Sequence, residues 1–162
     1  MLHLHTKIAQ GWASVRAPTT AGWTVGRSLS SAEWLFLFAA VLHLLAVPDH
    51  ASEWVGYAAF FVVTALAQGA YSLLLPRLAG QRWFLVAGVL STASLLGLWV
   101  QSRLWHTPVG PHRLHAEPFG LLDITVAVAE VVALLCLAHL YPYAQRRREH
   151  VRPPSTLESS WI

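Results

Sequence analysis

Four long apolar runs constrain the fold of this chain more than any other feature of its sequence. A helix needs about 20 mostly apolar residues to cross a bilayer, within a range of about 17–25. Such runs cover approximately residues 32–47, 54–75, 83–105 and 119–141. Only 12% of the 162 residues are charged, whereas soluble domains carry about 25%. The sequence therefore predicts an all-α integral membrane protein with four spanning helices.

Local signals set the predicted ends of these spans. Ser30 and Glu33 match a capping box, which predicts that the first helix starts here. Pro48, Pro76 and Pro142 are predicted to end the first, second and fourth helices, because proline removes one helical hydrogen bond. The short connections between the runs favour an up-down-up-down four-helix bundle.

Three parts of the chain follow from these spans: a membrane domain over residues 31–143, flanked by two polar segments. Residues 1–30 are predicted to be a cytoplasmic segment, and the apolar spacing within them also fits an amphipathic helix lying on the membrane. Residues 144–162 are predicted to form a basic, unstructured cytoplasmic tail. The single cysteine, Cys136, excludes an intramolecular disulfide and any site that needs two thiolates from one chain.

The basic residues give the predicted orientation. Nine of them flank the same ends of the spans: Lys7, Arg16, Arg27, Arg77, Arg82, Arg146, Arg147, Arg148 and Arg152. The opposite side has Arg113, with Arg103 just inside the third span. Since cytoplasmic loops of membrane proteins are enriched in Lys and Arg, both termini are predicted to be cytoplasmic. The predicted location is the inner (plasma) membrane, with several passes.

Histidines and acids gather at the opposite, outer side of the predicted bundle. Imidazole and carboxylate groups are ligands for zinc and copper. The candidate metal ligands are His43, His50, Glu53, His112, His115 and Asp123. Their spacing matches no known metal motif, and they would equally serve as helix caps and headgroup contacts. The sequence thus predicts an outer-face His/Asp/Glu site for a metal ion or a small ligand.

A second set of polar residues falls within the apolar runs: Gln68, Gln101, Arg103 and Glu130. Glu130 follows Asp123 by two helical turns on the same face, so both acids are expected to face Gln68 inside the bundle. Arg103 is a suitable partner for Asp123. Acids in membrane helices provide proton or cation paths in transporters, but they also form interhelical hydrogen bonds.

Several other classes of function receive less support. A bundle haem needs two axial histidines at one depth, and His43 and His139 lie near opposite ends of the spans. Haem is therefore not expected. An aromatic cluster near the outer interface could hold a quinone or lipid, although aromatic belts also form without a ligand. Its residues would be Tyr57, Trp99, Trp105 and Phe119, beside His43 and Asp123.

The sequence also argues against catalysis and against nucleic-acid binding. The sequence has no Gly-x-Ser-x-Gly elbow and no phosphate-binding loop, so an enzyme is not favoured. The arginines at 146–148 stand where a juxtamembrane anchor for anionic lipid would stand, which argues against a nucleic-acid partner.

Two stretches resemble loop motifs of small, uncharacterised four-span bacterial membrane proteins. The first is Pro48-Asp-His-Ala-Ser-Glu-Trp-Val-Gly-Tyr57. The second is Thr107-Pro-Val-Gly-Pro-His112 followed by Glu117-Pro-Phe-Gly-Leu-Leu-Asp123. The resemblance covers roughly residues 32–142, and it implies the four-span topology without implying an activity.

The sequence leaves three functional hypotheses. The first is a membrane protein that binds a metal ion or small ligand at its outer face. The second is an accessory or scaffold subunit of a larger membrane complex, without a ligand of its own. The third is a small proton or cation transporter that uses Glu130. All three place the protein in the lipid bilayer, and the second adds other membrane-protein subunits as partners.

Overall fold

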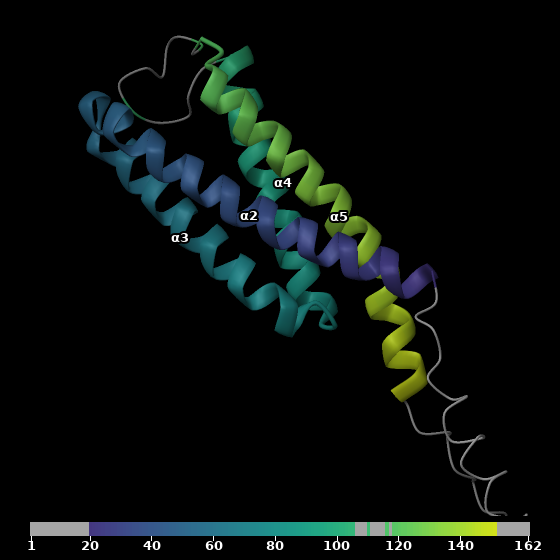
Figure 1. The fold of residues 1–162 in the computed structure, drawn as a ribbon. Helices are drawn as coiled ribbons and strands as arrows, with labels where there is room; N and C mark the ends of the chain where they lie inside the picture. The colour runs from purple at the N-terminus through teal and green to yellow at the C-terminus, as the bar shows by residue number, and fades with distance from the viewer. Residues whose placement is uncertain (1–19, 106–109, 111–115, 117, 152–162) are drawn as a thin grey trace, which may run out of the picture.

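The computed structural model describes residues 20–105, 110, 116 and 118–151 of the chain. Its four helices are α2 (Thr20–Glu53), α3 (Val55–Leu78), α4 (Arg82–Leu104) and α5 (Leu121–Val151) (Figure 1). Each contains a segment that is long and apolar enough to cross a membrane. These helices confirm the all-α class and the four predicted apolar helices.

The helices pack in an incomplete ring. α2 packs against both α3 and α5, and α5 packs against α4. Trp54 joins α2 to α3, and residues 79–81 join α3 to α4 at the other end of the bundle. We call these the α2–α3 end and the α3–α4 end. α3 and α4 diverge from their connection towards the α2–α3 end (Figure 1).

The apolar core lies near the α3–α4 end. Its buried members are Ala32, Phe36, Leu75, Phe84, Leu85, Ala133, Leu137, Leu140 and Ala144. The ring of Tyr71 on α3 stacks on Phe84 of α4, with ring centroids 4.7 Å from Phe36 and 4.3 Å from Phe84. The Tyr71 hydroxyl donates a hydrogen bond to the Phe84 carbonyl at 3.1 Å. This end of the bundle is therefore closely packed.

The predicted helices were too short: three of them were expected to end at prolines that the structure places inside helices, and the first was expected to begin later than it does. α2 begins at Thr20, so Ser30 and Glu33 lie within it and the predicted capping box is wrong. Pro48, Pro76 and Pro142 all lie inside helices. A proline removes only its own N–H donor, and membrane helices tolerate it where neighbouring groups satisfy the freed carbonyl.

The longer helices also extend into both segments that were predicted to flank the membrane domain. Residues 20–30, predicted as part of a separate cytoplasmic segment, belong to α2, and residues 144–151, predicted as an unstructured tail, belong to α5. The predicted surface helix within residues 1–19 lies outside the described residues, as does the tail after residue 151.

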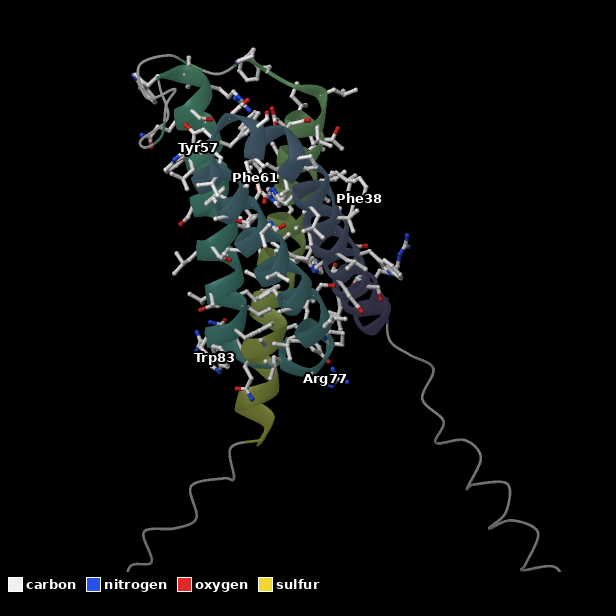
Figure 2. The ribbon with its side chains drawn as sticks, turned by 90° about the vertical axis from the view of Figure 1, so that its left-hand side faces the viewer. Phe38, Tyr57, Phe61, Arg77 and Trp83 are labelled. Carbon is white, nitrogen blue, oxygen red and sulfur yellow. The ribbon has the colours of Figure 1, made fainter. Side chains whose placement is uncertain are left out.

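Large apolar side chains cover the outside of the described bundle. Trp34 is 67% exposed, and Phe38, which Figure 2 shows pointing away from the bundle, is 46% exposed. Leu121, at the start of α5, is 83% exposed. A soluble protein rarely presents such a continuous apolar surface, so the structure supports a lipid bilayer as the surroundings of the four helices.

Candidate functional site

A cavity of about 330 Å³ lies between the four helices towards the α2–α3 end. Most of its wall is aliphatic or aromatic, with aromatic side chains from Trp54, Tyr57, Phe60, Phe61 and Trp99. Its polar side chains are those of His43, His50, Ser102, Arg103, Asp123 and Glu130. Small-molecule sites have this character: an apolar concave wall with a few polar groups.

The cavity exists because α3 and α4 diverge. Phe60 on α3 and Leu98 on α4 both line the cavity, and they are 42% and 39% exposed. α3 and α4 are not among the helix pairs that pack closely, and they diverge at this level (Figure 1). The cavity therefore opens sideways between α3 and α4, towards the surface that faces lipid.

Three buried side chains form a cluster beside the cavity, which we call the inner polar cluster: His43, Gln68 and Glu130. His43 and Glu130 line the cavity, and Gln68 lies behind them. The Gln68 amide nitrogen donates a hydrogen bond to Glu130 Oε1 at 2.6 Å, and His43 Nε2 lies 3.4 Å from the same oxygen. All three are buried, and Glu130 is only 3% exposed. The cluster ties α2, α3 and α5 together and brings a carboxyl group to the cavity.

Arg103 and Asp123 form a second polar group, the Arg103–Asp123 pair, between α4 and α5. An Arg103 guanidinium nitrogen donates to Asp123 Oδ2 at 2.6 Å, which is the distance of a strong charge-assisted hydrogen bond. Arg103 is 9% exposed. A buried cation is costly without a partner, so this contact explains how α4 carries an arginine inside an apolar segment.

Aromatic side chains of α2 and α3, which we call the aromatic wall, line the cavity beside these polar groups. The ring centroid of Phe61 lies 4.2 Å from that of His50 and 5.5 Å from that of His43. Tyr57 packs edge-on against Trp54 at 5.1 Å. Figure 2 shows Tyr57 and Phe61 near one end of the bundle, opposite Arg77 and Trp83. A planar ring in the cavity would contact this wall.

Three ring nitrogens of residues that line the cavity have no hydrogen-bond partner among the described residues. They are Nδ1 of His43, Nδ1 of His50 and Nε1 of Trp99, and all three atoms are buried. An unsatisfied buried polar group costs about 1–3 kcal/mol.

The predicted metal ligands do not form one cluster in the described part of the chain. His43 contacts Glu130, His50 Nδ1 lies 3.7 Å from Glu53, and Asp123 pairs with Arg103. Among the described residues, no three His, Cys, Asp or Glu side chains come close enough to hold a metal ion. The other two candidates, His112 and His115, lie outside the described residues.

The intramembrane polar residues divide between the cavity and the outer surface. Gln68 and Glu130 belong to the inner polar cluster, and Arg103 reaches Asp123, the partner that the sequence suggested. Gln101 lies elsewhere, in a shallow groove on α4 beside Trp105. It takes no part in the cavity.

The contact between His43 and Glu130 was missed from the sequence. Ending the first helix at Pro48 placed His43 close to the surface and Glu130 much deeper. In the structure α2 continues ten residues past His43 to Glu53, and α5 begins nine residues before Glu130 at Leu121. At about 1.5 Å per residue, both side chains then lie roughly 14–15 Å from the α2–α3 end.

Comparisons with known protein families, with curated proteins and with solved structures find no match to this chain. The resemblance to small four-span bacterial membrane proteins therefore stays a prediction.

Proposed function

We propose that this integral membrane protein binds a small lipid-soluble molecule in the cavity between its four helices. The observation that carries the proposal is the combination of an apolar wall, a sideways opening between α3 and α4, and two buried polar groups. A lipid-soluble molecule with a polar head satisfies all three: its apolar part enters through the opening, and its head reaches the polar groups.

The proposal includes an orientation. The spans cross the membrane alternately, with both termini in the cytoplasm and the α3–α4 end at the inner surface. Arg77 and Arg82, which flank the α3–α4 connection, support this orientation through the enrichment of basic residues in cytoplasmic loops. The cavity then opens within the outer half of an inner (plasma) membrane.

Filling the cavity tests the proposal. Ala127 lines the cavity and is 8% exposed, so Ala127→Phe places a ring in the space that a ligand would occupy. Ala138 lies on the same helix but is exposed to lipid, so Ala138→Phe adds the same ring without touching the cavity. Binding is measured in lipid nanodiscs by quenching of tryptophan fluorescence and by the shift in unfolding temperature.

The probes are decylubiquinol, decylubiquinone, oleate, farnesol and the tetraphenylphosphonium cation. We expect at least one to bind the wild type and the Ala138→Phe variant, with affinity lost in Ala127→Phe. The proposal is wrong if no probe binds the folded wild type, or if Ala127→Phe binds as well as the control.

The same experiment separates the alternative functions. A scaffold subunit without a ligand predicts that no probe binds. A cation transporter predicts that tetraphenylphosphonium binds best and that Glu130→Gln abolishes its binding, since Glu130 lines the cavity. Metal binding is not proposed, because the described side chains do not supply three ligands at one point.

A further inference from the structure

One carboxyl oxygen in the cavity is open to a ligand. Glu130 Oε1 accepts a hydrogen bond from Gln68 at 2.6 Å and lies 3.4 Å from His43 Nε2. Glu130 Oε2 has no hydrogen-bond donor among the described residues, but unlike Nδ1 of His43 it is not fully buried. Since Glu130 lines the cavity and its side chain is 4% exposed, Oε2 is the acceptor that it presents to a ligand.

The charges around Glu130 leave it without a permanent counter-ion. Among the described residues that line the cavity, Arg103 is the only Lys or Arg, and it lies 2.6 Å from Asp123. The neighbours of Glu130 are the uncharged Gln68 amide and the imidazole of His43, which is charged only when it is protonated. A cationic head would supply the missing charge, whereas the head of a fatty acid would place a second anion beside Glu130.

Aromatic rings line the cavity beside this carboxyl group. The ring centroid of Phe61 lies 5.5 Å from that of His43, the side chain that contacts Glu130. The remaining Phe, Tyr and Trp residues that line the cavity are Trp54, Tyr57, Phe60 and Trp99. The faces of such rings attract cations within about 6 Å, and most strongly where water is excluded. The cavity therefore combines a carboxyl acceptor with rings that favour a cation.

We propose that the ligand is a lipid-soluble amine, bound at Glu130 in its protonated form. This ligand class rests on the proposed function, since it specifies which lipid-soluble molecule fits the cavity. The ammonium N–H donates to Glu130 Oε2, the aromatic rings contact the charged head, and the apolar tail leaves between α3 and α4 into the lipid. A quaternary ammonium or a phosphonium cation has no N–H donor, so it binds more weakly.

One proton moves within the site when the amine binds. A buried contact between an imidazole and a carboxyl group favours zero net charge, so the empty cluster holds one exchangeable proton, either on Glu130 or as the second proton of His43. The amine enters from lipid in its uncharged form and takes this proton. Glu130 is then a carboxylate, and the neutral His43 donates its Nε2–H to Oε1. The net charge stays zero wherever the proton began.

Three ligands with one tail test the proposal on the wild type. Farnesol, N,N-dimethylfarnesylamine and N,N,N-trimethylfarnesylammonium differ only in their heads: a neutral donor, a cation with an N–H donor at neutral pH, and a cation without one. They are titrated against the protein in nanodiscs, and empty nanodiscs give the partition of each ligand into lipid. We expect the dimethylamine to bind roughly tenfold more tightly than either of the others, the factor that corresponds to one hydrogen bond to a charged group.

The variant Glu130→Gln then tests the site. It removes the negative charge and keeps a side chain of similar size, so the dimethylamine should bind no more tightly than farnesol. Glu33→Gln makes the same change towards the α3–α4 end, where the Glu33 carbonyl accepts from Ser72, and it should keep the wild-type preference. Because the ligands are compared within each variant, a general loss of stability does not imitate this result. If Glu130→Gln does not fold, the wild-type series decides.

The outcomes distinguish this inference from the proposed function. Equal affinities for the three farnesyl ligands, all lost in Ala127→Phe, would overturn the amine while leaving the proposed function standing. Tightest binding by the trimethylammonium or by tetraphenylphosphonium would also overturn it, as would a folded Glu130→Gln variant that still prefers the dimethylamine. No binding by any ligand would overturn both.

Discussion

Single residues in this bundle are coupled through buried pairs. Arg103 is the clearest case, because an arginine inside an apolar helix depends on the carboxylate that accepts from it at 2.6 Å. Glu130 depends in the same way on Gln68 and His43. The effect of a substitution at such a residue therefore depends mainly on the buried partner that remains without its contact, rather than on the side chain that is removed.

Removing one partner of the Arg103–Asp123 pair should destabilise the protein. In Asp123→Asn the buried guanidinium faces a neutral amide, and breaking a buried ion pair costs about 3–5 kcal/mol. Asp123 is partly exposed, so we expect the low end of this range, about 3 kcal/mol. The measurement is thermal unfolding in detergent micelles, followed by tryptophan fluorescence.

The double variant Arg103→Met/Asp123→Leu is the control for this prediction. Replacing both members of a buried pair with apolar residues is often neutral or stabilising. It should recover most of the stability that Asp123→Asn loses. A single variant as stable as the wild type would show that the pair does not hold α4 against α5.

At the scale of helices, close packing concentrates where α3 meets α4. A Cβ added at Gly88 would collide with the hydroxyl of Tyr71, which is itself held by its hydrogen bond to the Phe84 carbonyl. Gly97, nine residues along the same helix, has nothing within 4 Å of the equivalent position. The two glycines therefore form a matched pair for measuring contact between helices.

Gly88→Ala should destabilise the bundle, and Gly97→Ala should not. Overpacking at a closely packed position costs about 1–3 kcal/mol. At Gly97 the helix gains up to about 1 kcal/mol, because alanine has less backbone freedom to lose. Both are measured as shifts in the unfolding midpoint. Equal shifts for the two variants would contradict the close approach of Tyr71 to α4.

For the molecule as a whole, the orientation in the membrane decides which half of the bilayer the cavity opens into. Cysteine labelling in a Cys136→Ala background measures it. A membrane-impermeant maleimide should label Ala116→Cys in intact spheroplasts, because the connection between α4 and α5 is expected outside. Gln81→Cys, in the connection between α3 and α4, should react only after the membrane is permeabilised. The reverse pattern would invert the proposed topology.

The sequence predicted the features that depend on composition and depth. Apolar runs of sufficient length gave the four helices, and similar depth paired Arg103 with Asp123 and Gln68 with Glu130. The predicted helix ends were wrong, because a proline such as Pro48 commonly ends a helix in a soluble protein but is tolerated inside a packed membrane helix. As a result, His43 and Glu130 were predicted to lie at different depths in the membrane.

The cavity itself could not be predicted from the sequence. Its shape depends on where side chains of four helices fail to meet, and apolar runs look alike whether they pack closely or diverge. Phe84 and Leu98 illustrate this: both are apolar residues of α4, yet Phe84 is buried in the core and Leu98 lines the cavity. His112 and His115 lie outside the described residues, so their predicted metal role stays untested.

The packing of α4 mainly on α5 has a consequence for biogenesis. A growing chain inserts Arg103 before Asp123 has been synthesised, since the aspartate follows it by 20 residues. α2 and α3 can associate early, whereas α4 has to wait, with an unneutralised guanidinium, until α5 arrives. The cavity is therefore completed only after α5 has entered the bilayer, and a chain truncated before Leu121 would lack it even though α2, α3 and α4 had been inserted.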